Sequence, residues 1–114
     1  MKKYFMLLSL LSATACTLHC SDITGQWVMP IPGMENSVQG IDLRPRGVAQ
    51  SINMATLKYD TWYQESCDKI SIHGISIGNG QTIEFTETYL VSMPNKNTLN
   101  LTQDNGYTQT YTRK

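Results

Sequence analysis

The 114-residue sequence has little charge of either sign and no long apolar run. It contains nine basic and nine acidic residues, and the basic residues stand singly rather than in a stripe. A nucleic-acid-binding surface needs clustered lysine and arginine, so this distribution argues against DNA or RNA as a partner. The longest apolar run, Tyr4 to Leu11, is far shorter than the roughly 20 residues that span a bilayer. We therefore expect no permanent transmembrane helix.

The sequence also has few of the residues that carry catalysis or bind metals. Its two histidines, His19 and His73, are far apart, and none of its three cysteines belongs to a Cys-x-x-Cys pair, so we expect no metal site. It contains neither a Gly-x-Ser-x-Gly motif nor a phosphate-binding glycine loop. We predict that the protein is not an enzyme and needs no cofactor.

What the sequence does contain is strand-forming residues interrupted by turn-forming ones. Threonine, isoleucine, tyrosine and valine recur through the chain, while glycine and asparagine separate them. The alternation of apolar and polar residues predicts eight strands: 23–29, 38–44, 47–53, 56–63, 68–73, 82–92, a short segment with Leu99 and Leu101, and 107–113. Hairpin-sized turns join them, which predicts an all-β, eight-stranded antiparallel up-and-down β-barrel, because closure removes exposed edges. A two-sheet β-sandwich fits the same strand count.

The same alternation predicts which side chains point inward. Trp27 lies on the inner face of the first strand, and Val48, Ile52 and Met54, with Gln50 among them, share the predicted inner face of the third. In the fifth strand we expect Ile70 and Ile72 inside, with Ile75 and Ile77 continuing the same face after a bend at Gly74. These are the expected inner residues of the three strands: Ile23, Gly25, Trp27, Met29; Val48, Gln50, Ile52, Met54; Ile70, Ile72, Ile75, Ile77.

Two local patterns have more than one interpretation. Trp62 lies outside as an exposed aromatic, or a bulge after Asp60 brings it inside, because a slip of one residue reverses every face. The segment Pro30-Ile31-Pro32-Gly33 should end the first strand, since proline donates no backbone hydrogen bond. We expect this loop to plug one end of the barrel, and a lid over a ligand is the alternative.

The N-terminal residues predict export. Lys2 and Lys3, the apolar run and the small residues after it are typical of a signal peptide covering residues 1–15. The motif Ala13-Thr14-Ala15-Cys16 resembles a bacterial lipobox, which implies cleavage before Cys16 and a membrane anchor through lipid on Cys16. The same small residues also suit ordinary signal peptidase, which would release a soluble product.

The predicted product has a short tether, residues 16–22, followed by one domain, residues 23–114. We expect it to be anchored to the outer membrane, or free in the periplasm or at the cell surface. Loss of Lys2 and Lys3 leaves seven basic residues against nine acidic ones. Cys20 and Cys67 remain as thiols in an oxidising compartment, where they either form a disulfide or stay unpaired.

A small set of residues resembles a known family. Gly25-x-Trp27 on the first strand and Arg113 near the end of the last resemble lipocalins, in which the tryptophan closes one end of the barrel and the arginine packs across its ring. Such a cation–π contact is physically reasonable, because the first and last strands of a closed meander are neighbours. The stretches 51–62 and 74–83 look like those of small bacterial lipocalin-like proteins, many of them exported lipoproteins. This chain is shorter than typical lipocalins and lacks their helix before the last strand.

The inward-pointing aromatic residues predict a binding site for a small apolar ligand, inside the barrel or at its mouth. Its predicted members are Met54, Tyr59, Phe85, Glu87, Tyr89 and Tyr111. Glu87 or Gln50 would orient a polar group of the ligand. The alternative is that these side chains simply fill the barrel. The protein would then be an interaction or inhibitor module that docks another cell-envelope protein through Trp62 and His73.

Overall fold

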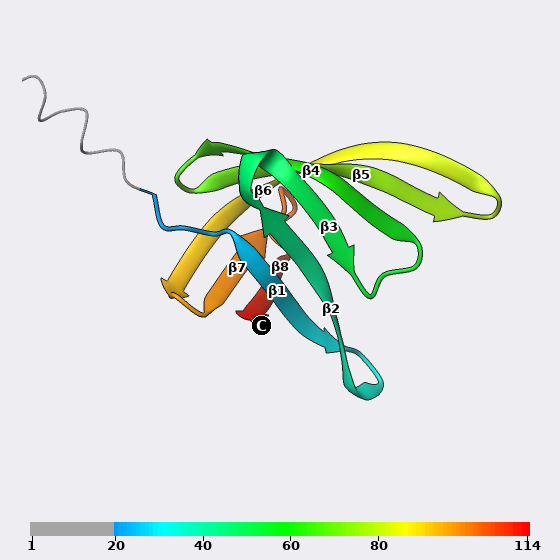
Figure 1. Cartoon of the computed structure of the whole chain (residues 1–114), viewed down its shortest axis with the longest axis horizontal. Coiled ribbons are helices and arrows are strands. Elements are labelled where there is room, and N and C mark those ends of the chain that lie inside the picture. The colour runs from blue at the N-terminus through cyan, green and yellow to red at the C-terminus, as the bar shows by residue number, and fades with distance from the viewer. Residues whose placement is uncertain (1–19) are drawn as a thin grey trace, which may run out of the picture.

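The structure is a computed structural model that describes residues 20–114, which form one closed barrel of eight antiparallel strands in the order of the chain (Figure 1). The strands are β1 (Gly25–Ile31), β2 (Met34–Arg44), β3 (Val48–Ile52), β4 (Leu57–Ser66), β5 (Lys69–Gly78), β6 (Gln81–Asn95), β7 (Thr98–Thr102) and β8 (Thr108–Arg113). A single 3-10 turn, η2 (Pro45–Gly47), joins β2 to β3. The barrel confirms the predicted up-and-down topology and excludes the sandwich. Residues 20–114 contain no helix long and apolar enough to cross a membrane.

The connections gather at two ends of the barrel, because successive strands run in opposite directions. We call one the closed end: it holds η2, the β4–β5 and β6–β7 turns, the start of the described chain and the end of β8. The other end, the mouth, holds the β1–β2, β3–β4, β5–β6 and β7–β8 connections. In Figure 1 the start of the described chain, in blue, and the β4–β5 and β6–β7 turns lie on the left, and the tips of the β1–β2 and β5–β6 hairpins lie on the right. The predicted signal peptide and Cys16 lie outside the described residues.

The interior next to the closed end is filled by side chains. Those that are almost completely buried come from four strands and the segment before β1: Ile23, Trp27, Ile41, Leu43, Ile70, Ile72, Leu99 and Leu101. The inward placement predicted for Trp27, Ile70, Ile72 and the two leucines is correct. Together with Ala49 these residues form the apolar core, whose burial is the main favourable term in folding.

One contact between the two ends of the chain closes this part of the barrel. β8 pairs with β1 at only two positions, Trp27 with Arg113 and Val28 with Thr112. The guanidinium of Arg113 lies over the Trp27 ring, with Cζ 4.3 Å from the ring centroid. Arg113 also donates to three carbonyl oxygens, from Nη1 to Thr24 at 2.8 Å, from Nε to Lys96 at 2.9 Å and from Nη2 to Asp22 at 3.4 Å. The arginine thus joins β8 to the chain start and to the β6–β7 turn.

Gly25 makes room for this arginine. A Cβ atom at position 25 would lie 2.7 Å from Arg113 Nη1, and Gly25 has φ +134°, a conformation that other residues rarely adopt. The indole Nε1 of Trp27 donates to the carbonyl of Ile23 at 2.9 Å, so the buried ring has its one polar atom satisfied. The Gly-x-Trp spacing therefore has a steric cause.

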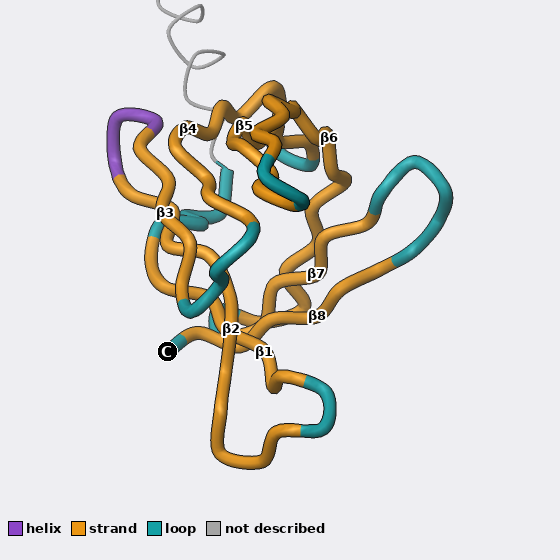
Figure 2. The backbone as a smooth tube through the Cα atoms, turned by 90° about the vertical axis from the view of Figure 1, so that its right-hand side faces the viewer, coloured by secondary structure: helices purple, strands orange, loops and turns teal. Residues whose placement is uncertain are grey.

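Both long hairpins at the mouth differ from the prediction. Pro30 and Ile31 do not end β1: they pair with Val38 and Met34, and only Pro32 and Gly33 form the turn. Pro30 is tolerated because it lacks a hydrogen-bonded partner on its other side, where β8 pairs with β1 only at two earlier positions. The tip projects from the body in both views and leaves Met34 55% exposed, so the expected plug is wrong (Figure 2).

β5 and β6 form a hairpin that is longer than predicted and extends past the core. The alternation of β5 continues through Gly74 without a bend, so Ile75 and Ile77 lie on the outer face and not with Ile70 and Ile72. The expectation for these two isoleucines was wrong because a change of face requires a bulge, and the β5 pairing contains none on that side.

β3 has the opposite face orientation to the predicted one. Ala49 is the buried residue, pairing with Leu43, while Val48 is 42% exposed and Gln50 is exposed opposite Asp42. The larger apolar residues led to the wrong face, because an alanine in the interior gives a weak hydrophobic signal. Gln50 therefore cannot orient a ligand inside the barrel.

In β4 a bulge brings Trp62 inward, which is the second of the two alternatives. Tyr59 pairs with Gly74 and Thr61 pairs with His73, so Asp60 is left without a partner in the ladder. After this extra residue, Trp62 packs against the core and its Nε1 donates to the carbonyl of Arg44 at 2.7 Å, while Tyr63 is exposed. Because of the bulge, Tyr59 before Asp60 and Trp62 after it both pack against the core.

A disulfide joins Cys20 to Cys67, with the two Cα atoms 5.0 Å apart. It ties the start of the described chain to the β4–β5 turn at the closed end. Of the two alternatives left open by the sequence, the structure has the paired one.

Replacing Gly25 by alanine should destabilise the barrel by about 3 kcal/mol, because the new Cβ collides with Arg113 and the backbone is strained. Gly80→Ala is the matched control: its φ is +74° but nothing lies within 4 Å of the new Cβ, so we expect a loss of about 1 kcal/mol. Urea unfolding of both variants measures the difference. Equal losses would show that Arg113 does not require the glycine.

Replacing Cys20 and Cys67 together by serine should lower the free energy of unfolding by about 2–4 kcal/mol, since the bond closes a loop with a sequence separation of 47. Thermal unfolding of the wild type with and without a thiol reductant measures the same contribution. A reductant that leaves the unfolding temperature of the wild type unchanged would contradict the bond's role.

Candidate functional site

The mouth of the barrel contains two adjoining cavities of about 390 and 300 Å³. They share four lining residues, Leu57, Tyr59, Tyr89 and Gln103, and therefore form one continuous site. The first extends toward the β3–β4 loop and Met54, and the second toward Phe85 and Glu87 on β6. Because the interior next to the closed end is filled, the room for a ligand lies in this half of the barrel.

Aromatic side chains form the inner wall of this site. Tyr59 on β4 and Phe85 on β6 meet edge to face, with ring centroids 6.2 Å apart and an interplanar angle of 76°. Tyr89, four residues further along β6 and on the same face, is almost completely buried. Such an arrangement offers flat apolar surfaces with phenolic hydroxyl groups as the polar contacts.

The phenols of this wall stay neutral well above neutral pH. Burial raises the pKa of Tyr59, and the neighbouring Tyr111, Tyr89 and Glu87 raise it further. Burial and the Glu87 carboxylate likewise raise the pKa of Tyr89. Neutral phenols can both donate and accept hydrogen bonds, so they can orient one polar group of a mainly apolar ligand.

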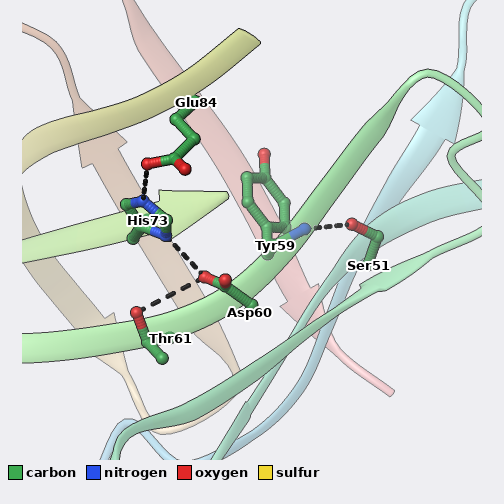
Figure 3. Close-up of polar contacts among 6 residues, drawn as sticks. All are labelled: Ser51, Tyr59, Asp60, Thr61, His73 and Glu84. Atoms are coloured by element: carbon green, nitrogen blue, oxygen red, sulfur yellow. Dashed lines mark hydrogen bonds and ion pairs between the residues drawn. The ribbon is translucent and has the colours of Figure 1, made fainter. Parts of the chain in front are cut away.

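Tyr59 lies next to the pair of neighbouring strands that share the fewest ladder positions, β3 and β4. β3 and β4 pair at one position only, Val48 with Thr61. Beyond that position the hydroxyl of Ser51 connects the two strands: it donates to the carbonyl of Leu57 at 2.7 Å and accepts from the amide of Tyr59 at 2.9 Å (Figure 3). A serine on the inner face of β3 thus substitutes for the missing ladder bonds and fixes the start of β4.

The structure brings most of the predicted ligand-binding residues together. Met54, Tyr59, Phe85, Glu87 and Tyr89 all line the mouth, although Met54 does so from the β3–β4 loop rather than from a strand. Glu87 lies on the same face of β6 as Phe85 and Tyr89. It remains exposed because this part of β6 extends past the core. Tyr111 differs: it is 3% exposed, lies in the core below the site, and donates to Gln109 Oε1 at 3.4 Å.

Sequence reasoning missed eight of the lining residues, three of which continue the inner faces of β4, β7 and β8. Leu57 precedes Tyr59 by two positions, Gln103 follows Leu99 and Leu101 in the same alternation, and Gln109 shares a face with Tyr111. Extending each inner face to the end of its strand would have found all three. At the mouth, an amide side chain can contact both water and ligand.

A second polar cluster lies outside the barrel, across the outer face of three strands. His73 on β5 donates from Nδ1 to Asp60 Oδ1 at 2.8 Å, and its Nε2 lies 3.6 Å from Glu84 Oε1 on β6 (Figure 3). The hydrogen bond from His73 lowers the pKa of Asp60, and the same bond raises the pKa of His73. The cluster therefore holds the bulged residue that turns Trp62 inward. Within residues 20–114 no group of three His, Cys, Asp or Glu side chains could hold a metal ion.

A wider, open hollow of about 660 Å³ lies on the outer surface beside η2. Arg46, Trp62, Tyr63, Gln64 and His73 are among its lining residues. The side-chain nitrogen of Gln64 is buried and has no hydrogen-bond partner within the described part of the chain. Tyr63, which is 68% exposed, lies at this hollow on the outer face, where it can contact a partner surface.

A Gly-x-Trp strand closed by an arginine, eight antiparallel strands and a pocket at one end define a small lipocalin-type barrel. The model of the lipocalin-like family matches residues 19–114, and the chain belongs to this family. It is similar to a lipocalin-like protein from Bacteroides thetaiotaomicron, known from a crystal structure, with 45% identity and a TM-score of 0.75 over 82% of this chain and 97% of that one. Among curated proteins no match was found.

The Asp60–His73 pair should make stability depend on pH. The pKa of Asp60 is lowered in the folded state, so the stability that Asp60 contributes is lost as pH falls through its folded-state pKa. The pKa of His73 is raised, so the stability that His73 contributes is complete below about pH 6.5 and is lost as pH rises through its folded-state pKa. The wild type should therefore exceed His73→Gln in stability most at about pH 5.5, with a smaller margin at about pH 8.5.

Urea unfolding at the two pH values measures this margin, and Asp60→Asn should remove it as His73→Gln does. If the difference between wild type and His73→Gln is the same at both pH values, the pair does not stabilise the fold through its charges.

Proposed function

We propose that this protein is exported and binds a small, mainly apolar molecule at the mouth of its barrel. The observation that carries the proposal is the continuous site formed by two cavities around Leu57, Tyr59, Tyr89 and Gln103. A binding function needs enclosed apolar surface with a few polar groups at fixed positions. The aromatic wall supplies the surface, and the phenols, Gln103 and Gln109 supply the polar groups.

The size of the site limits the ligand. The closed half of the barrel has no room, because Trp27, Ile41 and Leu101 fill it. The ligand therefore enters partway, with one end against Tyr89 and Gln103 and the other toward the exposed Glu87. Glu87 is exposed and acidic, which favours a neutral or cationic end group over an anionic one.

The proposal includes the location of the protein. The sequence of residues 1–16 supports export, and its resemblance to a lipobox supports attachment to a membrane through lipid on Cys16. The disulfide between Cys20 and Cys67 suits an oxidising compartment outside the cytoplasm.

Binding can be measured with the neutral fluorescent probe N-phenylnaphthylamine. Phe85→Ala should weaken binding about tenfold, which corresponds to loss of about 1.4 kcal/mol from one aromatic contact. Leu57→Trp should abolish binding, because Leu57 lines both cavities and the larger ring fills them. Tyr63→Ala is the control, since Tyr63 lies on the outer face and is 68% exposed.

Native mass spectrometry after incubation with an extract of bacterial envelope would then identify the natural ligand as a discrete added mass that Leu57→Trp loses. Saturable binding that is equally strong in Leu57→Trp and the wild type would place the ligand elsewhere and refute the mouth as the site.

The outer hollow supports a second candidate, in which the barrel docks another envelope protein. Exposed Tyr63 favours a contact there, whereas Trp62, which points inward, is not available as the exposed anchor that this function would use. A Tyr63→Ala change that disrupts a complex in the envelope while leaving probe binding intact would favour docking.

A further inference from the structure

The charged side chains are distributed unevenly between the two ends of the barrel. Six of the seven basic residues in the described part of the chain lie at the closed end: Arg44, Arg46, Lys69, Lys96, Arg113 and Lys114. Four acidic residues share that end: Asp22, Asp42, Glu65 and Asp68. Toward the mouth, Lys58 is accompanied by four acidic residues whose side chains the structure describes, Asp60, Glu84, Glu87 and Asp104. One end of the barrel is therefore basic and the other acidic.

The cations at the closed end are available to a partner. Arg46, Lys69, Lys96 and Lys114 are exposed and form no ion pair with another described residue. Two of the acidic groups nearby are already engaged. Asp42 pairs with Arg44 at 3.0 Å, and Asp22 accepts from the backbone amide and the hydroxyl of Thr24.

Exposed apolar side chains lie beside these cations. Val48, 42% exposed, follows the turn that contains Arg46, and Leu90, 54% exposed, pairs across the ladder with Lys69. Basic side chains next to exposed apolar ones are typical of surfaces that rest on the headgroup region of a bilayer.

The chain also leaves the barrel at this end. The disulfide to Cys67 fixes Cys20 at the β4–β5 turn, and Cys16 precedes Cys20 by four residues. Four residues reach at most about 14 Å, even when fully extended. A lipid on Cys16 would hold the closed end, and not the mouth, against the bilayer.

We propose that the closed end is a docking face for an anionic phospholipid surface, with the mouth directed away from the membrane. The proposal deepens the function proposed above and rests on it for the anchor at Cys16. Attraction of the basic end and repulsion of the acidic mouth orient the barrel in the same sense as the tether. The ligand site then faces the aqueous compartment, so its ligand is exchanged with that compartment rather than drawn directly from the bilayer below.

Fluorescent labels test the orientation of the acylated protein in vesicles of phosphatidylethanolamine and phosphatidylglycerol. Asn97→Cys places a label in the β6–β7 turn, and Thr82→Cys places one near the β5–β6 tip, without changing a charge. Lipids that carry a quencher on the headgroup should quench the label at position 97 several times more than the label at 82. Equal quenching, or stronger quenching of the label at position 82, would refute the proposed orientation. It would not contradict attachment of the protein through lipid on Cys16.

A Cys16→Ala protein separates the surface from the anchor. It should sediment with phosphatidylglycerol vesicles but not with phosphatidylcholine vesicles, and added salt should release it. Lys69→Glu alone should weaken this binding severalfold, whereas Lys58→Glu, the matched single change toward the mouth, should not. Combined Arg46→Glu, Lys69→Glu and Lys96→Glu changes should weaken it at least about tenfold.

Binding of the Cys16→Ala protein that ignores lipid charge, or that Lys58→Glu weakens as much as Lys69→Glu, refutes the basic face. Binding of N-phenylnaphthylamine by the same variants reports the mouth independently, so a failure of the surface is distinguishable from a failure of the ligand site.

Discussion

The contact between Arg113 and Trp27 is the interaction on which the rest of the barrel depends. β1 and β8 share only two ladder positions, and the Lys114 amide donates one further bond to the Gln26 carbonyl, so few backbone bonds join them. The arginine supplies the rest, because it covers the indole ring and donates to carbonyls of the chain start and of the β6–β7 turn. Gly25 is required by the same contact, since a side chain there would occupy the position of the guanidinium.

The tightly packed closed end contrasts with a mouth whose strands have fewer pairing partners. The large core residues gather around Trp27, and toward the mouth the strands diverge until β3 and β4 are joined mainly through the Ser51 hydroxyl. β6 residues 81–88 pair with β5 and with no other described strand. The mouth is therefore the less restrained half of the molecule, which is where a binding site that must admit a ligand is expected.

The strand count and the topology followed from alternation and turn residues, since hairpins with short turns leave few other closed arrangements. The errors arose where a single residue determines the face of a strand. In β3, the larger Val48 indicated the wrong face, although Ala49 is the residue that lies in the interior. In β5, Ile75 and Ile77 were expected on the face of Ile70 and Ile72, whereas strict alternation places Gly74 on that face. The bulge at Asp60 could be suspected but not decided, because its partner His73 comes from another strand. Leu57, Gln103 and Gln109 continue the inner faces of their strands, so the alternation could have indicated them. How far each strand extends past the core is a property of the assembled barrel.

Amide hydrogen exchange, measured residue by residue, tests most directly whether the barrel is locked at one end and loose at the other. Amides that pair around the closed end, such as those of Val28, Ile41 and Arg113, should exchange only through global unfolding. Amides of β6 between residues 82 and 88 should exchange through local opening, many times faster. Uniform protection along β6, equal to that of Val28 and Ile41, would contradict this division of the barrel into a locked core and an open mouth.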